Sequence, residues 1–220
     1  MAGVFRCSSL DKCQKAQMMV YYGIPPTIPP YLQNVLNIGT YIHEYLQSHF
    51  MALDLTKQVE IEYEWEDLKL RGHCDGRNQC PESLRGIIPD AMVNNCEPYI
   101  MEIKSISPSR FRYLTEPHDN YKTQLNAYLH RSGIHRGVFI YVNKGIPGMC
   151  SGLFHPEYLN DPNKYKVFPI DYDPIRWMKI ERQVWPMIPY LETGELIPIQ
   201  YNPDPKSECG DCWYKGRCAP

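Results

Sequence analysis

An aspartate, a glutamate and a lysine occur at spacings that suit hydrolytic chemistry. Asp75 lies at the end of a predicted strand, and Glu102 and Lys104 are two apart within another. Residues two apart on a strand point to the same face, so Glu102 and Lys104 are expected side by side. Acidic oxygens on adjacent strands suit Mg²⁺ or Mn²⁺. Such an ion would polarise a phosphodiester, and the lysine would orient or deprotonate the attacking water.

Three further polar residues extend this set. His43 lies on a predicted helix and would be the third ligand that a site with two acids lacks. Gln124 and Tyr128 are four apart, so they share one face of a later predicted helix. Taken singly, each pattern has an ordinary structural interpretation, such as a solvated ion pair or a hairpin turn. Their occurrence together and in this order favours a metal-dependent site.

The ordered motifs resemble those of the PD-(D/E)XK nuclease superfamily, specifically the RecB-like exonucleases. That group includes the CRISPR-associated adaptation exonucleases and many phage-encoded relatives, and this chain resembles the phage relatives more. The resemblance extends over roughly residues 7–218. The matching positions are Gly39, His43 and Glu44 (G-x-x-x-H-E), Gly72, Asp75 and Gly76 (G-x-x-D-G), Glu102 and Lys104 (E-x-K), and Gln124 and Tyr128 (Q-x-x-x-Y).

The resemblance implies a role for the matched positions. The metal ligands would be His43, Asp75 and Glu102, with the backbone carbonyl of Ile103 as a further ligand. Lys104 would be the catalytic lysine. The residues that position DNA or this lysine would be Gln124 and Tyr128.

The spacing of the two acids leaves one alternative open. Asp75 and Glu102 are 27 positions apart, whereas the family usually brings in the second acid within about a hairpin's length. Asp90 lies only 12 positions before Glu102, which suits a direct hairpin. Gly72 and its neighbours surround Asp75 as in phage relatives, which favours Asp75. Residues 77–93 would then be an insertion.

Three cysteines late in the chain have the spacing of metal ligands. Cys209, Cys212 and Cys218 form a C-x₂-C-x₅-C pattern, and no segment resembles a secretory signal peptide. Clustered thiols that stay reduced favour metal binding over disulfides. The best candidate for the fourth ligand is Cys13, and the alternative is Cys7. A Cys₄ site can hold an iron–sulfur cluster or zinc, and the resemblance implies a 4Fe-4S cluster.

Hydrophobic periodicity predicts the elements that would position these residues. Helices are predicted over 10–22, 31–51, 119–131 and 173–192. The helix over 31–51 is expected to face a core with Leu32, Val35, Leu36, Ile42, Leu46 and Phe50. Strands are predicted over 58–66 and 68–75, as a pair, and over 97–106, 138–142 and 165–170, with short strand pieces at 87–88 and 91–93.

This order of elements indicates an α/β fold with a mixed central β-sheet flanked by helices. The resemblance further implies a restriction-endonuclease-like core whose N- and C-terminal segments are joined by the Cys₄ metal cluster. We expect a single nuclease domain over residues 1–220, with its core at about 31–192. The iron–sulfur region would consist of residues 7–30 and 193–220.

Charge is separated along the chain although its total is nearly neutral. The formal net charge is −2, with 43% hydrophobic and 22% charged residues, which excludes a disordered chain, a coiled coil and a collagen-like fibre. Residues 101–144 carry seven basic and three acidic side chains, whereas 51–70 carry two and six. Basic residues interleaved with aromatics suit single-stranded nucleic acid. The candidates for DNA contact are Arg110, Arg112, Tyr113 and Lys122, and the alternative interpretation is a solvated loop.

The motifs and the resemblance together imply a metal-dependent DNA exonuclease that prefers single strands or DNA ends. Its cofactors would be Mn²⁺ or Mg²⁺ and a 4Fe-4S cluster, with Zn²⁺ as the alternative. It would act with recombination or CRISPR-adaptation proteins, in phage recombination or replication or in CRISPR-type DNA processing. The alternatives are a non-cleaving nucleic-acid-binding accessory protein of the same fold and a zinc-stabilised protein without nuclease activity.

Location is predicted from what the sequence lacks. No run approaches the ~18 apolar residues of a membrane span, so no membrane partner is expected. A cytoplasmic protein is expected, in the host cytoplasm if the chain is phage-encoded. The sequence indicates no oligomeric state.

Overall fold

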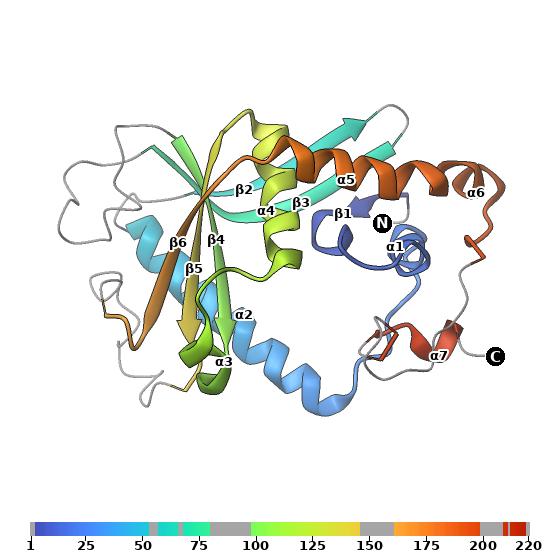
Figure 1. Ribbon diagram of the computed structural model, residues 1–220. Coiled ribbons are helices and arrows are strands. Elements are labelled where there is room, and N and C mark those ends of the chain that lie inside the picture. The colour runs from blue at the N-terminus through green and yellow to red at the C-terminus, as the bar shows by residue number, and fades with distance from the viewer. Residues whose placement is uncertain are drawn as a thin grey trace.

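The computed structural model describes residues 3–52, 57–65, 68–79, 98–145, 161–198, 209–210 and 212–218. Within these ranges the chain forms one six-stranded sheet with helices packed around it (Figure 1). The strands are β1 (Phe5–Arg6), β2 (Lys57–Trp65), β3 (Leu68–Gln79), β4 (Pro98–Ile106), β5 (Arg136–Asn143) and β6 (Tyr165–Asp171). The helices are α1 (Gln14–Tyr21), α2 (Pro30–Ala52), α3 (Pro108–Tyr113), α4 (Asp119–Ser132), α5 (Pro174–Val184), α6 (Ile188–Thr193) and α7 (Lys215–Cys218), with 3₁₀ turns η1 (Cys7–Ser9) and η4 (Trp185–Met187).

The sheet is mixed, which confirms the predicted fold class. Its main path runs β1-β3-β4-β5-β6, and β2 pairs with β3 outside that path. The β4–β5 and β1–β3 pairs are parallel and the others are antiparallel. In β5 every residue except the first and last is buried, as expected for a strand covered on both faces. The predicted pairing of the strands at 58–66 and 68–75 is confirmed, and β3 continues to Gln79.

Two helices enclose the middle of the sheet. Lys104 of β4 donates to Gln124 of α4 at 3.2 Å, whereas the next residue, Ser105, lies beside Gly39 of α2. Successive strand residues point to opposite faces, so α4 covers one face and α2 the other. In Figure 1, α4 lies in front of the strands and α2 crosses behind them. The predicted site residues therefore come from three layers.

The first half of α2 departs from the prediction. Ile42 and Leu46 are buried as expected, but Val35 is 45% exposed and Leu36 is 37% exposed. Figure 1 shows this half extending past the strands, so the sheet does not cover it. The expectation that Val35 and Leu36 face a core is therefore wrong. The side chain of Phe50 lies outside the described residues.

Other boundaries differ for local reasons. The helix predicted over 10–22 begins only at Gln14, and residues 10–13 form a turn between η1 and α1. The helix predicted over 173–192 divides into α5, η4 and α6, since Pro186 and Pro189 cannot donate backbone hydrogen bonds. β1, α3 and α7 are too short to produce a periodic pattern. The strand pieces predicted within 87–93 lie outside the described residues. Among the described residues, no helix has the length and apolar character needed to cross a membrane.

A buried asparagine joins α4 to α5. Asn126 is 1% exposed, its Nδ2 donates to the carbonyl of Asp173 at 3.0 Å, and its Oδ1 accepts from the backbone N of Asp173 at 2.8 Å. The Asp173 side chain in turn caps α5 by accepting from Ile175 and Arg176. Asn126 thereby fixes α5 against the helix that covers the front of the sheet.

Asn126→Ala should lower the free energy of unfolding by about 1–3 kcal/mol, because it leaves two backbone groups of Asp173 without their partners. Denaturant unfolding followed by circular dichroism measures this difference. Asn120→Ala, at an exposed position of the same helix, is the matched control and should change the stability by less than about 0.5 kcal/mol. Equal stability of Asn126→Ala and wild type would contradict the structural role of this contact.

Candidate active site

One edge of β3 is shared by two strands with a gap between them. β1 pairs with Leu70 and Arg71 on this edge, and β4 pairs with the segment from Gly76 to Gln79. β2 occupies the opposite edge. Within the described ranges, positions 72–75 therefore have no strand partner on the first edge. Buried backbone groups at such a gap need partners from side chains or water.

Two side chains bridge this gap. Asp75 directly precedes the residues that pair with β4, and its Oδ2 accepts a hydrogen bond from the backbone N of Ile103 at 2.7 Å. Further along the gap, the hydroxyl of Tyr128 donates to the carbonyl of His73 at 3.0 Å. The fork between β3 and β4 thus fixes the first predicted acid beside the strand that carries the second.

Helix α2 orients Asp75 from the opposite layer. Nδ1 of His43 lies 3.3 Å from Oδ1 of Asp75. Nε2 of Gln47 donates to the same oxygen and to the Asp75 carbonyl, both at 3.1 Å. Gln47 is not among the residues predicted from sequence. Its spacing of four from His43, which places it on the same helix face, is the sequence signal for it, but a weak one.

Glu102 is the more deeply buried acid. It is 2% exposed, and its Oε1 accepts from Nζ of Lys104 at 2.7 Å and from Nε2 of Gln124 at 2.9 Å. Its Oε2 is buried and has no hydrogen-bond partner among the described residues. Burial and the negative charge of Asp75 raise the pKa of Glu102 to about 7, against the lowering effect of Lys104. The surroundings thus disfavour a bare negative charge here, and a bound cation would compensate it.

Lys104 has three close partners. Besides Glu102, its Nζ donates to Oε1 of Gln124 at 3.2 Å and lies 4.5 Å from the centroid of the Tyr121 ring. Nε2 of Gln124 also donates to the hydroxyl of Tyr128 at 2.9 Å. Burial opposes the charge of Lys104, but attraction by Glu102 raises the pKa of the lysine. The predicted motifs omit Tyr121, although its spacing of three from Gln124 places it on the same helix face.

The donor set fits a hard divalent cation. Asp75 and Glu102 supply the carboxylate oxygens that Mg²⁺ and Mn²⁺ prefer, and Oε2 of Glu102 is a buried oxygen that such an ion would satisfy. As placed, no three His, Cys, Asp or Glu side chains in the described ranges lie close enough together to hold a metal ion. Waters would complete the coordination, since Mg²⁺ usually keeps several.

Two predicted ligands are not decided by these contacts. Asp90, the alternative acid, lies outside the described residues. Ile103 contributes its backbone N–H to Asp75, whereas the metal contact of its carbonyl stays a prediction.

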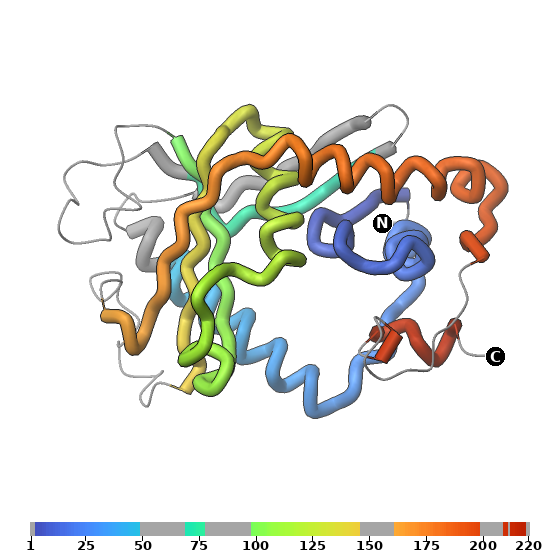
Figure 2. The backbone as a smooth tube through the Cα atoms, viewed as in Figure 1, coloured from blue at the N-terminus to red at the C-terminus, as the bar shows by residue number. Residues whose placement is uncertain are grey.

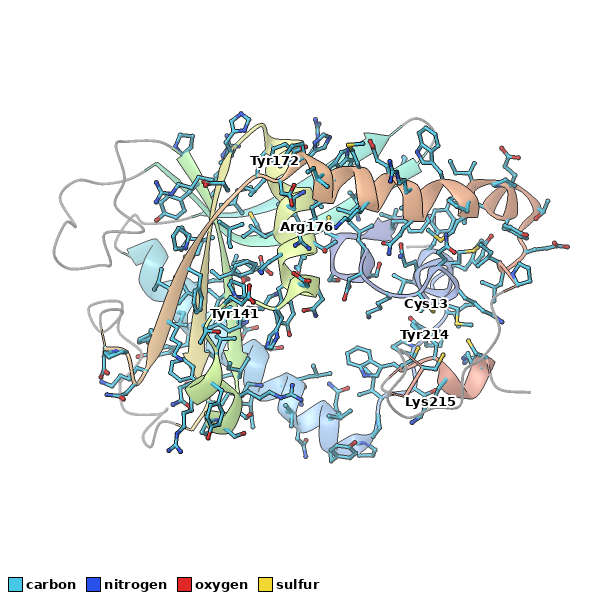
Figure 3. The ribbon with its side chains drawn as sticks, in the orientation of Figure 1. Cys13, Tyr141, Tyr172, Arg176, Tyr214 and Lys215 are labelled. Atoms are coloured by element: carbon cyan, nitrogen blue, oxygen red, sulfur yellow. The ribbon has the colours of Figure 1, made fainter. Side chains whose placement is uncertain are left out.

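The C-terminal cysteines lie against the first helix. Cys13 precedes α1 and packs with Cys212 and Cys218 around a small cluster of Ala16, Met19 and Tyr214. Burial, followed by the nearby thiol groups of Cys212, Cys209 and Cys218, raises the pKa of Cys13. Figure 2 shows α1 and α7 on the same side of the molecule, and Figure 3 shows Cys13 next to Tyr214. The structure therefore places Cys13 on the side of the tail, packed with Cys212 and Cys218, although as placed the described cysteines do not form a group that could hold a metal ion.

Cys7, the alternative fourth ligand, does not join this group. It is 2% exposed and lies in the main core together with Cys74 and Tyr128. Its Cβ lies next to Gly72 of β3. Burial raises the pKa of the Cys7 thiol far above its ordinary value. Cys7 thus faces the sheet, whereas Cys13 faces the tail. Cys7, Cys13, Cys212 and Cys218 are free thiols.

The candidates for DNA contact are only partly together. Arg110, Arg112 and Tyr113 lie on α3, directly after β4, and all three are exposed, with Tyr113 at 77%. Lys122 lies on α4, where its Nζ is paired with Glu116 at 2.7 Å. The first three form an exposed basic and aromatic group, and Lys122 is not part of it.

Comparison with known proteins identifies the fold. No protein-family model and no curated protein matches the sequence. The crystal structure of SSO0001 matches with a TM-score of 0.61 at 16% identity, covering 100% of this chain and 87% of that one. LHK-Exo, an alkaline exonuclease from Laribacter hongkongensis, matches with a TM-score of 0.54 at 14% identity, over 87% of this chain and 89% of that one. Its complex with dAMP gives 0.55 at 13% over the same shares. The chain thus shares the fold of these proteins.

Gly72 allows the close approach of α4 to β3. A Cβ at this position would lie 2.5 Å from Cε1 and 2.8 Å from the hydroxyl oxygen of Tyr128. Gly72→Ala should therefore displace Tyr128 and lower the free energy of unfolding by about 1–3 kcal/mol. Chemical denaturation measures the change. In the control Gly216→Ala the added Cβ meets nothing within 4 Å, so near-wild-type stability is expected. A Gly72→Ala protein as stable as the control would refute the tight packing.

Proposed function

We propose that this protein is a metal-dependent deoxyribonuclease that removes nucleotides from DNA ends. The observation that carries the proposal is the buried Glu102 carboxylate, which binds Lys104 through one oxygen and leaves the other without a partner among the described residues. A buried ion pair stabilises a fold no better than apolar side chains would, so it suggests a functional requirement. The fold shared with LHK-Exo and the ordered motifs support the same conclusion.

The two acids would hold the metal ion. In this proposal Asp75 and Glu102 bind Mg²⁺ or Mn²⁺, with His43 and the carbonyl of Ile103 as further ligands. When bound, the ion would polarise the scissile phosphate and lower the pKa of a coordinated water. Asp75 is already held by Gln47 and by the N–H of Ile103, so its carboxylate needs little reorganisation on binding.

Lys104 would act on the substrate directly. Its ammonium is held by Glu102 and Gln124 on the face of β4 that carries the buried acid. From there it would orient the attacking water and stabilise negative charge on the phosphate oxygens. Gln124 would act as a positioning residue for the lysine, and Tyr128 would hold Gln124.

The proposed substrate is single-stranded DNA or a DNA end. Arg110, Arg112 and Tyr113 would contact it, because they are exposed immediately after the strand that carries Glu102. Cationic and aromatic side chains together suit phosphate contacts and base stacking. Roles in phage recombination, replication or CRISPR-type processing, with their partner proteins, stay expectations from the resemblance.

Glu102→Gln should reduce metal-dependent degradation of end-labelled DNA by at least about a hundredfold. Glutamine keeps an oxygen for Lys104 but removes the negative charge that binds the ion. Single- and double-stranded substrates with Mg²⁺ or Mn²⁺ give the rate, and the product ladder gives the polarity. Glu192→Gln, an exposed position on α6, is the matched control and should degrade DNA like wild type.

Two results would refute the nuclease proposal. One is degradation by Glu102→Gln at the wild-type rate. The other is wild-type protein that binds DNA in the presence of Mg²⁺ or Mn²⁺ without cleaving it. The second result would establish the alternative, a non-cleaving accessory protein.

We further propose that Cys13, Cys209, Cys212 and Cys218 hold a 4Fe-4S cluster, with zinc as the alternative. The packing of Cys13 with Cys212 and Cys218 beside α1 supports a shared metal group, and the resemblance favours iron. Such a group would link the C-terminal tail to α1. Metal binding would therefore stabilise the folded form of the protein.

Elemental analysis tests this second proposal. Wild-type protein purified without oxygen should contain iron and sulfide, and Cys13→Ser should lose most of both. Cys74→Ala, which removes a buried thiol from the main core, is the control and should retain them. Zinc without iron would support the zinc alternative. Wild-type protein with neither metal would contradict a shared metal group.

A further inference from the structure

A cavity of about 590 Å³ lies between helix α4 and the C-terminal tail. Its lining comes from the segment around η1, the start of α1, the first turn of α4 and the tail. The residues with most binding potential are Lys12, Asn120, Tyr121 and Trp213. This volume falls within the range of about 300–1,000 Å³ that is typical of small-molecule sites. Apart from Tyr121, its lining lies outside the network around Glu102.

The cavity combines an aromatic surface with the positive charge of Lys12, beside which the acid Asp11 also lines the wall. Nζ of Lys12 lies 5.1 Å from the centroid of the Trp213 ring. Tyr121 contributes a second aromatic ring to the lining, and Asn120 contributes hydrogen-bonding groups. A ligand that matches this wall needs a flat π system and an adjacent negative charge, because rings stack on indoles and anions pair with ammonium groups. A nucleotide has both.

Tyr121 connects this cavity with the catalytic centre. Its ring lines the cavity and also contacts the ammonium group of Lys104, at 4.5 Å from the ring centroid. The cavity and the proposed catalytic lysine therefore share one aromatic residue. A DNA strand bound at Lys104 would have a neighbouring nucleotide within reach of the cavity.

We propose that this cavity is a nucleotide-binding subsite for the strand being degraded. Trp213 stacks on a base of single-stranded DNA, and Lys12 binds an adjacent phosphate. The proposal deepens the nuclease function and rests on it. Cys13 and Cys212 also line the cavity, so a metal group held by them would help to fix the position of Trp213. The backbone of Trp213 is already anchored, since its carbonyl accepts from the N of Thr27 at 2.9 Å.

Binding of a fluorescent single-stranded oligonucleotide in EDTA tests the subsite without cleavage. Trp213→Ala should weaken binding by about 5- to 100-fold, and Lys12→Met should weaken it severalfold. Trp213→Phe keeps a ring and should retain most of the affinity. Trp185→Phe and Trp185→Ala are the matched controls, because Trp185 is a 56% exposed tryptophan on η4. Unchanged affinity of Trp213→Ala and Lys12→Met would overturn the proposal.

A direct measurement covers the case in which Trp213→Ala disturbs the fold. Wild-type protein is irradiated with a single-stranded oligonucleotide containing 5-iodouracil, and the cross-linked peptide is identified by mass spectrometry. Cross-links to the peptides with Trp213 or Tyr121 are expected, and unlabelled oligonucleotide should suppress them. Suppression by excess dAMP as well would show that free nucleotide occupies the same subsite. Cross-links confined to other peptides would overturn the proposal.

These outcomes separate the subsite from the nuclease proposal. Protein that cleaves DNA while Trp213→Ala binds and cross-links like wild type would refute the subsite alone. Protein that fails to cleave with Mg²⁺ or Mn²⁺, yet binds single strands through Trp213, would refute the nuclease function alone.

Discussion

The hydrogen bond from the backbone N of Ile103 to the carboxylate of Asp75, at 2.7 Å, marks the constraint on which the site depends. β3 and β4 pair only up to Gly76, so the strands separate where the first acid stands. If backbone hydrogen bonds between β3 and β4 continued past Gly76, they would pair the backbone groups there and leave no place for a carboxylate between the strands. The fork instead lets Asp75 replace a strand partner and brings it beside the strand that carries Glu102.

The helices on either face make this arrangement specific. α2 holds Asp75 through His43 and Gln47. α4 holds Glu102 and Lys104 through Gln124. Each helix reaches the site with polar side chains while its neighbouring residues pack in the core. A buried ion pair with one unsatisfied carboxylate oxygen is costly unless something else compensates it, and a divalent cation is the natural compensation.

Much of this site can be predicted from sequence because its motifs are local. The spacing of Glu102 and Lys104 follows from strand geometry, and that of Gln124 and Tyr128 follows from helix geometry. The sequence does not show that β3 and β4 separate, because divergence depends on how β1 and β4 share one edge. Gln47 and Tyr121 are missed because an isolated glutamine or tyrosine on a helix face has no distinctive pattern.

In the fold, too, local patterns can be predicted from the sequence and tertiary packing cannot. The mixed α/β sheet follows from the order of periodic segments, whereas the exposure of Val35 does not. Its spacing is that of a core position, and only the length of α2 relative to the sheet leaves it outside. Which of Cys13 and Cys7 joins the C-terminal cysteines also depends on tertiary structure. Both lie near the start of the first helical region, since Cys7 begins η1 and Cys13 directly precedes α1. Only the packing of the tail against α1 separates them.

The most direct test of this account is a titration of the protein with Mn²⁺, followed by the electron paramagnetic resonance signal of free Mn²⁺, without DNA. Wild type should remove Mn²⁺ from solution, and Asp75→Asn and Glu102→Gln should each weaken this binding by at least about tenfold. Thiolates prefer softer metals, so the cysteine tail should not compete for Mn²⁺. Mn²⁺ binding that is unchanged in both variants would contradict the central claim that the fork between β3 and β4 forms a cation site.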